Sequence, residues 1–254
     1  MRKEREVIEK NALFCYNRTI KNCVDRWIMN KKINIMDVGI DRYTAKEVLE
    51  IAVDGMDTLP VTVIQIVTSD SLLRLATVPG LTKEMSELDV VLAGETTLLQ
   101  AAGVEDRKYL QDIENRRALK LVMHYMHKRH KRIYFLAEKQ EEIIAFSQYI
   151  QKFYHGICIA DAMCVTKENR NDEMIVNAIN GEDVDCVLSV LSSPLQEELI
   201  IKNKALLNVN IWVNLGKEII PVCRNRVKQK WMTQFLTKRI LQKEMKKCRK
   251  NGGN

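Results

Sequence analysis

One stretch in the last third of the chain carries the most specific chemical pattern. A predicted buried strand ends there in a turn of small residues that includes Ser192 and Ser193, and Pro194 follows at the expected first position of a helix. A helix N-terminus presents free N–H groups that suit a phosphate, and Gln196 could hydrogen-bond a nucleobase or a phosphate. A purely structural interpretation also stands: Ser193 caps the helix, and Glu197 complements its dipole.

The elements that position this turn follow from the apolar pattern. Short runs rich in Val and Ile predict strands buried on both faces, with helices between them. The predicted strands are Ile33–Val38, Val61–Val67, Asp89–Ala93, Arg132–Ala137, Gly156–Asp161, Asp185–Val190 and Val209–Leu215. The predicted helices cover about 44–56, 69–77, 107–129, 139–153, 171–180 and 195–204. This alternation predicts an α/β fold: a doubly wound, mostly parallel sheet with helices on both faces.

In such a sheet, ligands bind outside the carboxyl ends of the strands. The loops after Val67, Ala93, Ala137 and Val190 are therefore where a site is expected, and we expect the turns after Val67, Ala93 and Val190 to share one rim.

Three histidines recur at His124, His127 and His130. On a helix the first two share a face and the third is rotated away, and the Lys and Arg residues around them oppose a cation. We interpret them as part of a basic helix C-terminus, favoured by the helix dipole. No metal site and no cofactor is expected.

Composition favours a cytoplasmic protein. The seven cysteines are an odd number without a C-x-x-C pair, which fits a reducing compartment. No run approaches the roughly 18 apolar residues that span a bilayer, and the N-terminus lacks the apolar core of a secretory signal.

The positive charge is concentrated at the two ends of the chain. Residues 224–254 contain eleven Lys and Arg against one acidic side chain, residues 1–32 are also basic, and the middle is net acidic. Trp231, Phe235 and Ile240 belong to the apolar face of an amphipathic C-terminal helix, a pattern typical of a helix lying on an anionic membrane surface. The same helix could instead pack on the body or on a partner subunit. Nothing except the positive charge suggests that the protein binds nucleic acid, and no recognisable nucleic-acid-binding module supports that function.

Five segments between residues 132 and 197 carry a resemblance to a known family. They are Arg132-Ile133-Tyr134-Phe135-Leu136, Lys152-Phe153-Tyr154-His155-Gly156, Ile175-Val176-Asn177-Ala178-Ile179-Asn180, Val184-Asp185-Cys186-Val187-Leu188, and Ser193-Pro194-Leu195-Gln196-Glu197. Through them the stretch 132–216 resembles the C-terminal half of the TagA/WecG/CpsF glycosyltransferases (glycosyltransferase family 26), whose Pro-x-Gln-Glu matches the last segment, and the similarity extends over about 33–245. The resemblance implies transfer of an N-acetylmannosamine-type sugar from a UDP donor to a polyprenyl-diphosphate-linked acceptor at the cytoplasmic membrane face.

The chain departs from the family at its catalytic turn. The usual Asp corresponds to Gly94, and Glu95 follows it as a candidate substitute base, or as a carboxylate that complements a helix dipole. Thr68 stands where the family has Asn, and a glycine pair is replaced by Ala137-Glu138, whose side chains narrow a diphosphate pocket. Further candidate substrate-binding residues are Thr96 and Thr97 in the same turn, Ser192, Ser193 and Gln196, and Arg224 and Arg226, which lie near the family's lipid-diphosphate arginines.

These observations predict three regions: a basic helical extension (1–32), an α/β glycosyltransferase-like domain (33–223) and a basic amphipathic membrane-surface segment (224–254). Two functions remain open. The chain is either a diverged glycosyltransferase or a catalytically inactive family member that acts as a scaffold. The expected partners are a UDP-sugar, a polyprenyl-diphosphate-linked acceptor, an anionic membrane, and a second copy of the chain or a related glycosyltransferase. Nucleic acid is not expected.

Overall fold

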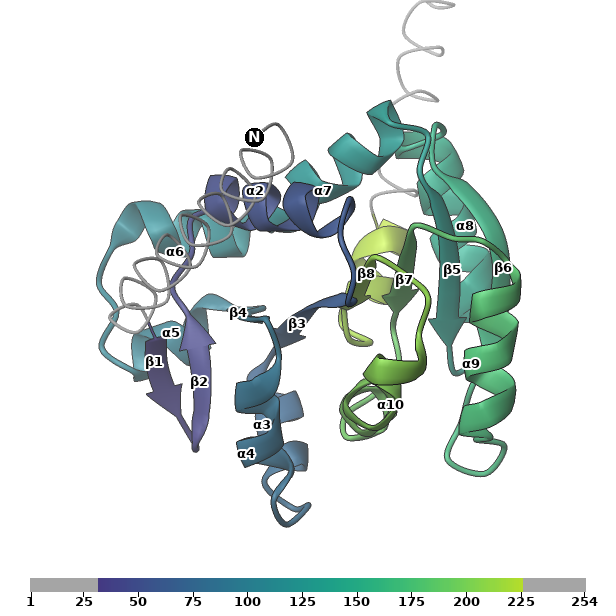
Figure 1. Cartoon of the computed structure of the whole chain (residues 1–254). Helices are drawn as coiled ribbons and strands as arrows, with labels where there is room; N and C mark the ends of the chain where they lie inside the picture. The colour runs from purple at the N-terminus through teal and green to yellow at the C-terminus, as the bar shows by residue number, and fades with distance from the viewer. Residues whose placement is uncertain (1–31, 226–254) are drawn as a thin grey trace, which may run out of the picture.

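The computed structural model describes residues 32–225 (Figure 1); the N-terminal extension before residue 32 and the basic segment from residue 226, including its predicted helix, lie outside the described residues. In the described part, six parallel strands form one sheet in the order β4-β3-β8-β7-β5-β6. Their bounds are β3 (Thr62–Val67), β4 (Val90–Ala93), β5 (Arg132–Ala137), β6 (Cys158–Cys164), β7 (Cys186–Ser189) and β8 (Ile211–Asn214). The predicted parallel sheet is confirmed.

Helices cover both faces of this sheet, as predicted. Their bounds are α2 (Ala45–Gly55), α3 (Ser69–Leu75), α4 (Leu81–Glu84), α5 (Thr96–Ala101), α6 (Arg107–Glu114), α7 (Arg117–Lys128), α8 (Gln140–Phe153), α9 (Asp172–Gly181) and α10 (Leu195–Asn203), with short 3₁₀ turns at η2 (Met85–Glu87) and η3 (Lys204–Leu206). One core contains buried residues of α2, α7 and α8, and the other contains those of α3, α5, α9 and α10. In Figure 1, α2 and α7 lie side by side above the sheet, whereas α3 and α10 lie below it.

The strands fill both cores because their apolar side chains alternate in direction. In β5, Tyr134 points into one core and Phe135 into the other, and both are fully buried. Phe135 stacks on Phe146 of α8 with 4.1 Å between ring centroids. Burial on both faces explains why these strands appear in the sequence as short continuous apolar runs.

The predicted single strand Ile33–Val38 is wrong. The segment forms a hairpin of two antiparallel strands, β1 (Lys32–Ile35) and β2 (Val38–Asp41), which are not strands of the six-stranded sheet. Met36 and Asp37 form its turn with φ angles of 52° and 65°. Positive φ at both central residues gives the turn the twist of the flanking strands, a geometry usually built from Asn-Gly or Asp-Gly.

The predicted helix 107–129 is two helices. Arg116 adopts a φ of 49° between α6 and α7 and ends the first helix. The break has a packing reason: Tyr109 of α6 is buried in one core, whereas Met123 and Met126 of α7 are buried in the other. A straight helix could not reach both faces of the sheet.

Candidate functional site

The order of the strands creates a crevice in the middle of the sheet. The chain runs outward from β3 to β4 on one side and from β5 to β6 on the other, so β8 and β7 lie between the two diverging halves. Ligands of open α/β sheets bind at such a switch point, outside the carboxyl ends of the strands. Because all six strands are parallel, the turns after Val67, Ala93 and Val190 lie at this one edge, as predicted.

A polar cleft of about 320 Å³ lies at this edge. It is lined by Ile66, Asp70, Ser71, Arg74, Glu138, Leu191, Ser192, Ser193, Gln196, Gly216, Lys217 and Glu218. The predicted substrate-binding residues Ser192, Ser193 and Gln196 therefore line one cavity together. Residues that follow β3, β5 and β8 complete its walls.

Ser192 already has a protein partner in this cleft. Its N–H donates to the carboxylate of Glu138 at 2.7 Å, and its hydroxyl donates to the same oxygen. Lys217 donates to the other oxygen of Glu138. Burial raises the pKa of Glu138, but the hydrogen bonds from Lys217 and Ser192 outweigh that effect and leave the pKa below its ordinary value. Glu138 is thus held as a carboxylate.

The start of α10 differs from the sequence expectation at Pro194 and Ser193. Pro194 occupies the cap position, the helix begins at Leu195, and no side chain caps it. Ser193 does not cap but donates its hydroxyl to Glu197 at 2.7 Å. Glu197 is fully buried, and its Oε1 also accepts from Gln196 at 2.9 Å and from Gln65 at 3.0 Å. Glu197 therefore organises a buried network.

This network continues into the sheet and leaves acceptors unused. Gln65 accepts from Asn214 at 2.7 Å, and Asn214 accepts from the indole N–H of Trp212 at 2.7 Å. Burial raises the pKa of Glu197, although the hydrogen bonds from Ser193, Gln196 and Gln65 oppose the rise. Gln196 Oε1 is buried and has no hydrogen-bond partner among the described residues. The network thus fixes Gln196 with one acceptor unsatisfied.

Thr68 sits between the polar cleft and a second cavity. It caps α3, accepting from the N–H of Ser71 at 3.3 Å, while its own N–H donates to the Ser71 hydroxyl at 2.7 Å. The Thr68 hydroxyl also lies 3.4 Å from Oε1 of Glu218, an exposed carboxylate. The capping interaction fixes the Thr68 side chain beside Glu218.

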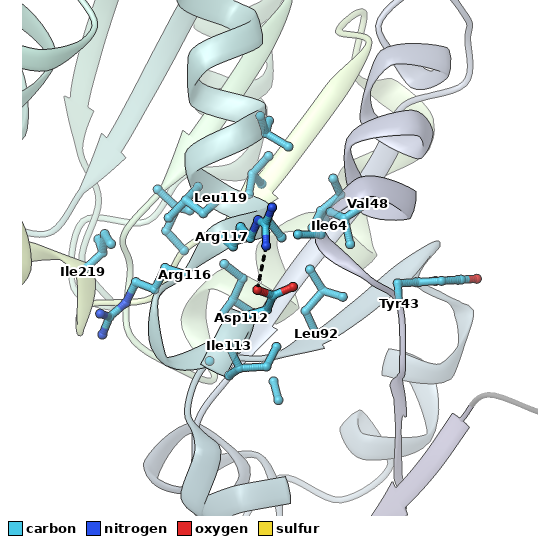
Figure 2. A pocket seen from close by; sticks show the side chains of 18 of the residues that line it. Tyr43, Val48, Ile64, Leu92, Asp112, Ile113, Arg116, Arg117, Leu119 and Ile219 are labelled. Atoms are coloured by element: carbon cyan, nitrogen blue, oxygen red, sulfur yellow. Dashed lines mark hydrogen bonds and ion pairs between the residues drawn. The ribbon is translucent and has the colours of Figure 1, made fainter. Parts of the chain in front are cut away.

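The second cavity is an apolar pocket of about 70 Å³ between α2, α7 and the sheet (Figure 2). Its walls are mainly aliphatic and include Val48, Ile64, Leu92, Leu119, Val122 and Val213, with Thr68, Gly94 and Glu218 also lining it. Arg117 pairs with Asp112 at 3.2 Å, and Figure 2 shows Arg116 extending away from that pair. Ile66 and Glu218 line both the apolar pocket and the polar cleft, so the two cavities adjoin.

Glu95 has a partner outside these two cavities. Its carboxylate accepts from the N–H of Ser69 at 2.7 Å, so it complements the N-terminus of α3 rather than that of its own helix. Glu95, Thr96 and Thr97 are absent from the linings of the polar cleft and the apolar pocket. The structure does not bring them together with Gln196.

Gly94, the position of the family's Asp in the resemblance, is closely packed. A Cβ atom there would lie 2.9 Å from Cγ2 of Ile66 and 3.1 Å from Cγ2 of Thr68. Any side chain at residue 94 requires these neighbours to shift. The side chains of Ile66 and Thr68 therefore leave room only for a glycine at this position.

Sequence reasoning missed Lys217 and Glu218, which line the polar cleft after β8. The predicted strand Val209–Leu215 offered a signal, because a parallel strand ends at the same edge as its neighbours. Gly216 follows that strand with a φ of 70°, which turns the chain at this edge and places the two charged residues there.

The remaining candidates lie apart from the cavities. Arg224 is exposed near the end of the described chain, and Arg226 lies outside it. His127 accepts from the N–H of Gly156 at 2.8 Å. Residues 32–225 contain no group of three metal-ligating side chains suited to a metal ion, and no helix among them has the length and apolarity to cross a bilayer.

A parallel sheet with helices on both faces and a polar cleft at its switch point defines a doubly wound α/β protein with its candidate ligand site outside the carboxyl ends of the strands. The family described as "Glycosyl transferase WecG/TagA/CpsF family" matches residues 33–234. The chain belongs to this glycosyltransferase family. No curated protein matches it.

Proposed function

We propose that the chain transfers an N-acetylhexosamine-type sugar from a UDP donor to a polyprenyl-diphosphate-linked acceptor in cell-surface polysaccharide synthesis. The observation that carries this proposal is the junction of the two cavities beside Thr68 and Glu218. The polar cleft offers the hydroxyl, amide and ammonium groups that a nucleotide requires. The adjoining apolar pocket shares Glu218 with it, so the part of an acceptor that reaches this junction would face the donor.

Sugar transfer to a hydroxyl needs a titratable group within hydrogen-bond reach of that hydroxyl. Glu95, the residue after the family's Asp position, is one candidate for this group, and Thr68 is the other candidate catalytic residue. The geometry supports Glu218 as a second candidate, because it is exposed, lines both cavities and lies 3.4 Å from the Thr68 hydroxyl. We therefore propose Glu218 as the base and Glu95 as a residue that positions α3 through Ser69.

The test is a UDP-release assay with UDP-N-acetylmannosamine and related donors on a lipid-diphosphate acceptor, beside a UDP-binding titration. Glu218→Gln is expected to lower turnover by about a hundred- to ten-thousand-fold, the usual contribution of a positioned base, while UDP affinity stays nearly constant. Glu95→Gln should have a smaller effect. Glu173→Gln, an exposed carboxylate on α9, is the matched control. Equal turnover in the wild type and Glu218→Gln would exclude this base, and a larger loss in Glu95→Gln would restore the role to Glu95.

A second candidate function is a non-catalytic scaffold or partner subunit of an active glycosyltransferase. Two observations favour it: Gly94 is packed against Ile66 and Thr68, and Ser192 is engaged by Glu138. UDP binding without turnover of any donor would support this alternative and contradict the enzyme.

We further propose that the protein works at the inner face of the cell membrane. The support is the charge of residues 224–254 and their apolar residues, which together suit an anionic surface. In this proposal, residues 33–223 form the domain that contains the site and residues 1–32 form a separate basic extension.

A further inference from the structure

Three hydrogen-bond donors of the polar cleft converge on a single carboxylate. They are the N–H of Ser192, the hydroxyl of Ser192 and the ammonium of Lys217, and their common acceptor is Glu138. The donors come from the turns after β7 and β8, and the acceptor follows β5. Convergent donors from separate elements form an anion site, and a carboxylate of the chain itself occupies it.

Glu138 is placed there by the start of α8. The N–H groups of Glu138 and Lys139 donate to Glu142 at 3.0 and 3.1 Å, which fixes the backbone of the turn. Lys217 also lies 3.9 Å from Glu142, so it keeps one acidic neighbour if the Glu138 side chain turns away. The Lys217 side chain is 32% exposed, which leaves solvent access to the donors.

A second, independent feature of the cleft points to a ligand. Gln196 is 1% exposed, and its Oε1 has no hydrogen-bond partner among the described residues. Its Nε2 donates to Glu197, so a rotation of the amide that gave Oε1 a partner would break that hydrogen bond. A buried acceptor without a donor is costly, and a ligand N–H or O–H group in the cleft would satisfy it.

We infer that Ser192 and Lys217 form a phosphate-binding subsite and that Glu138 is a built-in competitor, displaced when the phosphate of a nucleoside diphosphate binds. A phosphate has more charge and more acceptor oxygens than a carboxylate, so it can take all three donors. Gln196 Oε1 then accepts from the same ligand. This inference rests on the proposed UDP site. Glu138 thereby sets how strongly the cleft discriminates between a nucleotide and the corresponding nucleoside.

Calorimetric titration of the full chain with UDP and with uridine tests the inference. Glu138→Ala removes the competitor and is expected to tighten UDP binding about ten- to a hundred-fold, the worth of a charge-assisted hydrogen bond. Uridine has no phosphate, so its affinity should be unchanged. Glu138→Gln keeps the shape without the charge and should give a smaller gain; it also serves if the alanine variant does not fold.

Two controls separate this effect from general electrostatics. Glu141→Gln removes an exposed charge from the same helix and should leave UDP affinity unchanged. Lys217→Ala added to Glu138→Ala should cancel most of the gain. Equal UDP affinity in the wild type and both Glu138 variants, an equal gain in Glu141→Gln, or no UDP binding by any protein would each overturn the inference. Turnover is measured separately: tighter UDP binding without turnover keeps this inference and contradicts the proposed enzyme.

Discussion

Replacement of Glu197 by Leu should sharply destabilise the domain. Oε1 of Glu197 is the shared acceptor for Ser193, Gln196 and Gln65, all within the buried network beneath the polar cleft. Gln65 Nε2 also donates to the carbonyl of Ile66 at 3.0 Å, so it keeps a partner in the variant. The other two donors would lose theirs.

A buried donor without an acceptor costs about 1–3 kcal/mol, so two of them lower the free energy of unfolding by about 2–6 kcal/mol. Domains of this kind have total stabilities of about 5–15 kcal/mol, so the loss should be easily detected. Glu197→Gln retains the acceptor oxygen in the same shape, but its amide N–H₂ replaces Oε2, which has no hydrogen-bond partner among the described residues. This variant should therefore be destabilised less than Glu197→Leu, because Ser193 and Gln196 keep their acceptor.

Urea denaturation followed by circular dichroism measures both variants. Because burial raises the pKa of Glu197, the folded state holds its proton more tightly than the unfolded state. The stability that Glu197 contributes is fully present below the ordinary Glu pKa, and it is lost as the pH rises from there to the raised pKa of Glu197 in the folded state. Relative to Glu197→Gln, the wild type should therefore weaken with rising pH across that window. Equal destabilisation by Leu and Gln would refute the role of Glu197 as an acceptor.

Two further predictions concern the family's missing Asp and the basic tail. Gly94→Ala should lower the free energy of unfolding by about 1–3 kcal/mol, because its Cβ would press on Ile66 and Thr68; an unchanged denaturation midpoint would contradict this. Gly94→Asp should not raise turnover, because its side chain meets the same two neighbours. The full chain should co-sediment with anionic liposomes, and deletion of 226–254 or high salt should weaken that binding; binding that survives the deletion would remove the membrane role from this segment.

The sequence predicted the sheet because its strands are buried on both faces and appear as short aliphatic runs. It missed the hairpin because Met36 is an unusual residue for a turn with positive φ, and Asp37 stands where such a turn usually has Gly. It missed the break at Arg116 because that break depends on which core each half of the segment enters. Neither cause is visible in local periodicity.

The candidate site was predictable only where its residues share one turn. Ser192, Ser193 and Gln196 follow a single strand, so they were found together. The contact between Glu138 and Ser192 joins residues 54 positions apart, and that between Glu218 and Thr68 joins residues 150 apart. Such pairings depend on strand order and side-chain direction, which a single sequence does not reveal.

The hairpin at the start of the described chain affects whether the edge of the sheet can pair with another protein chain. β4 is an edge strand, and its Val91 N–H donates at 2.8 Å to Asp41, a carboxylate only 1% exposed at the end of β2. An open edge with free N–H groups is a template for pairing with another chain. By engaging that donor with a charged side chain, the hairpin protects this edge against strand addition and thus against aggregation.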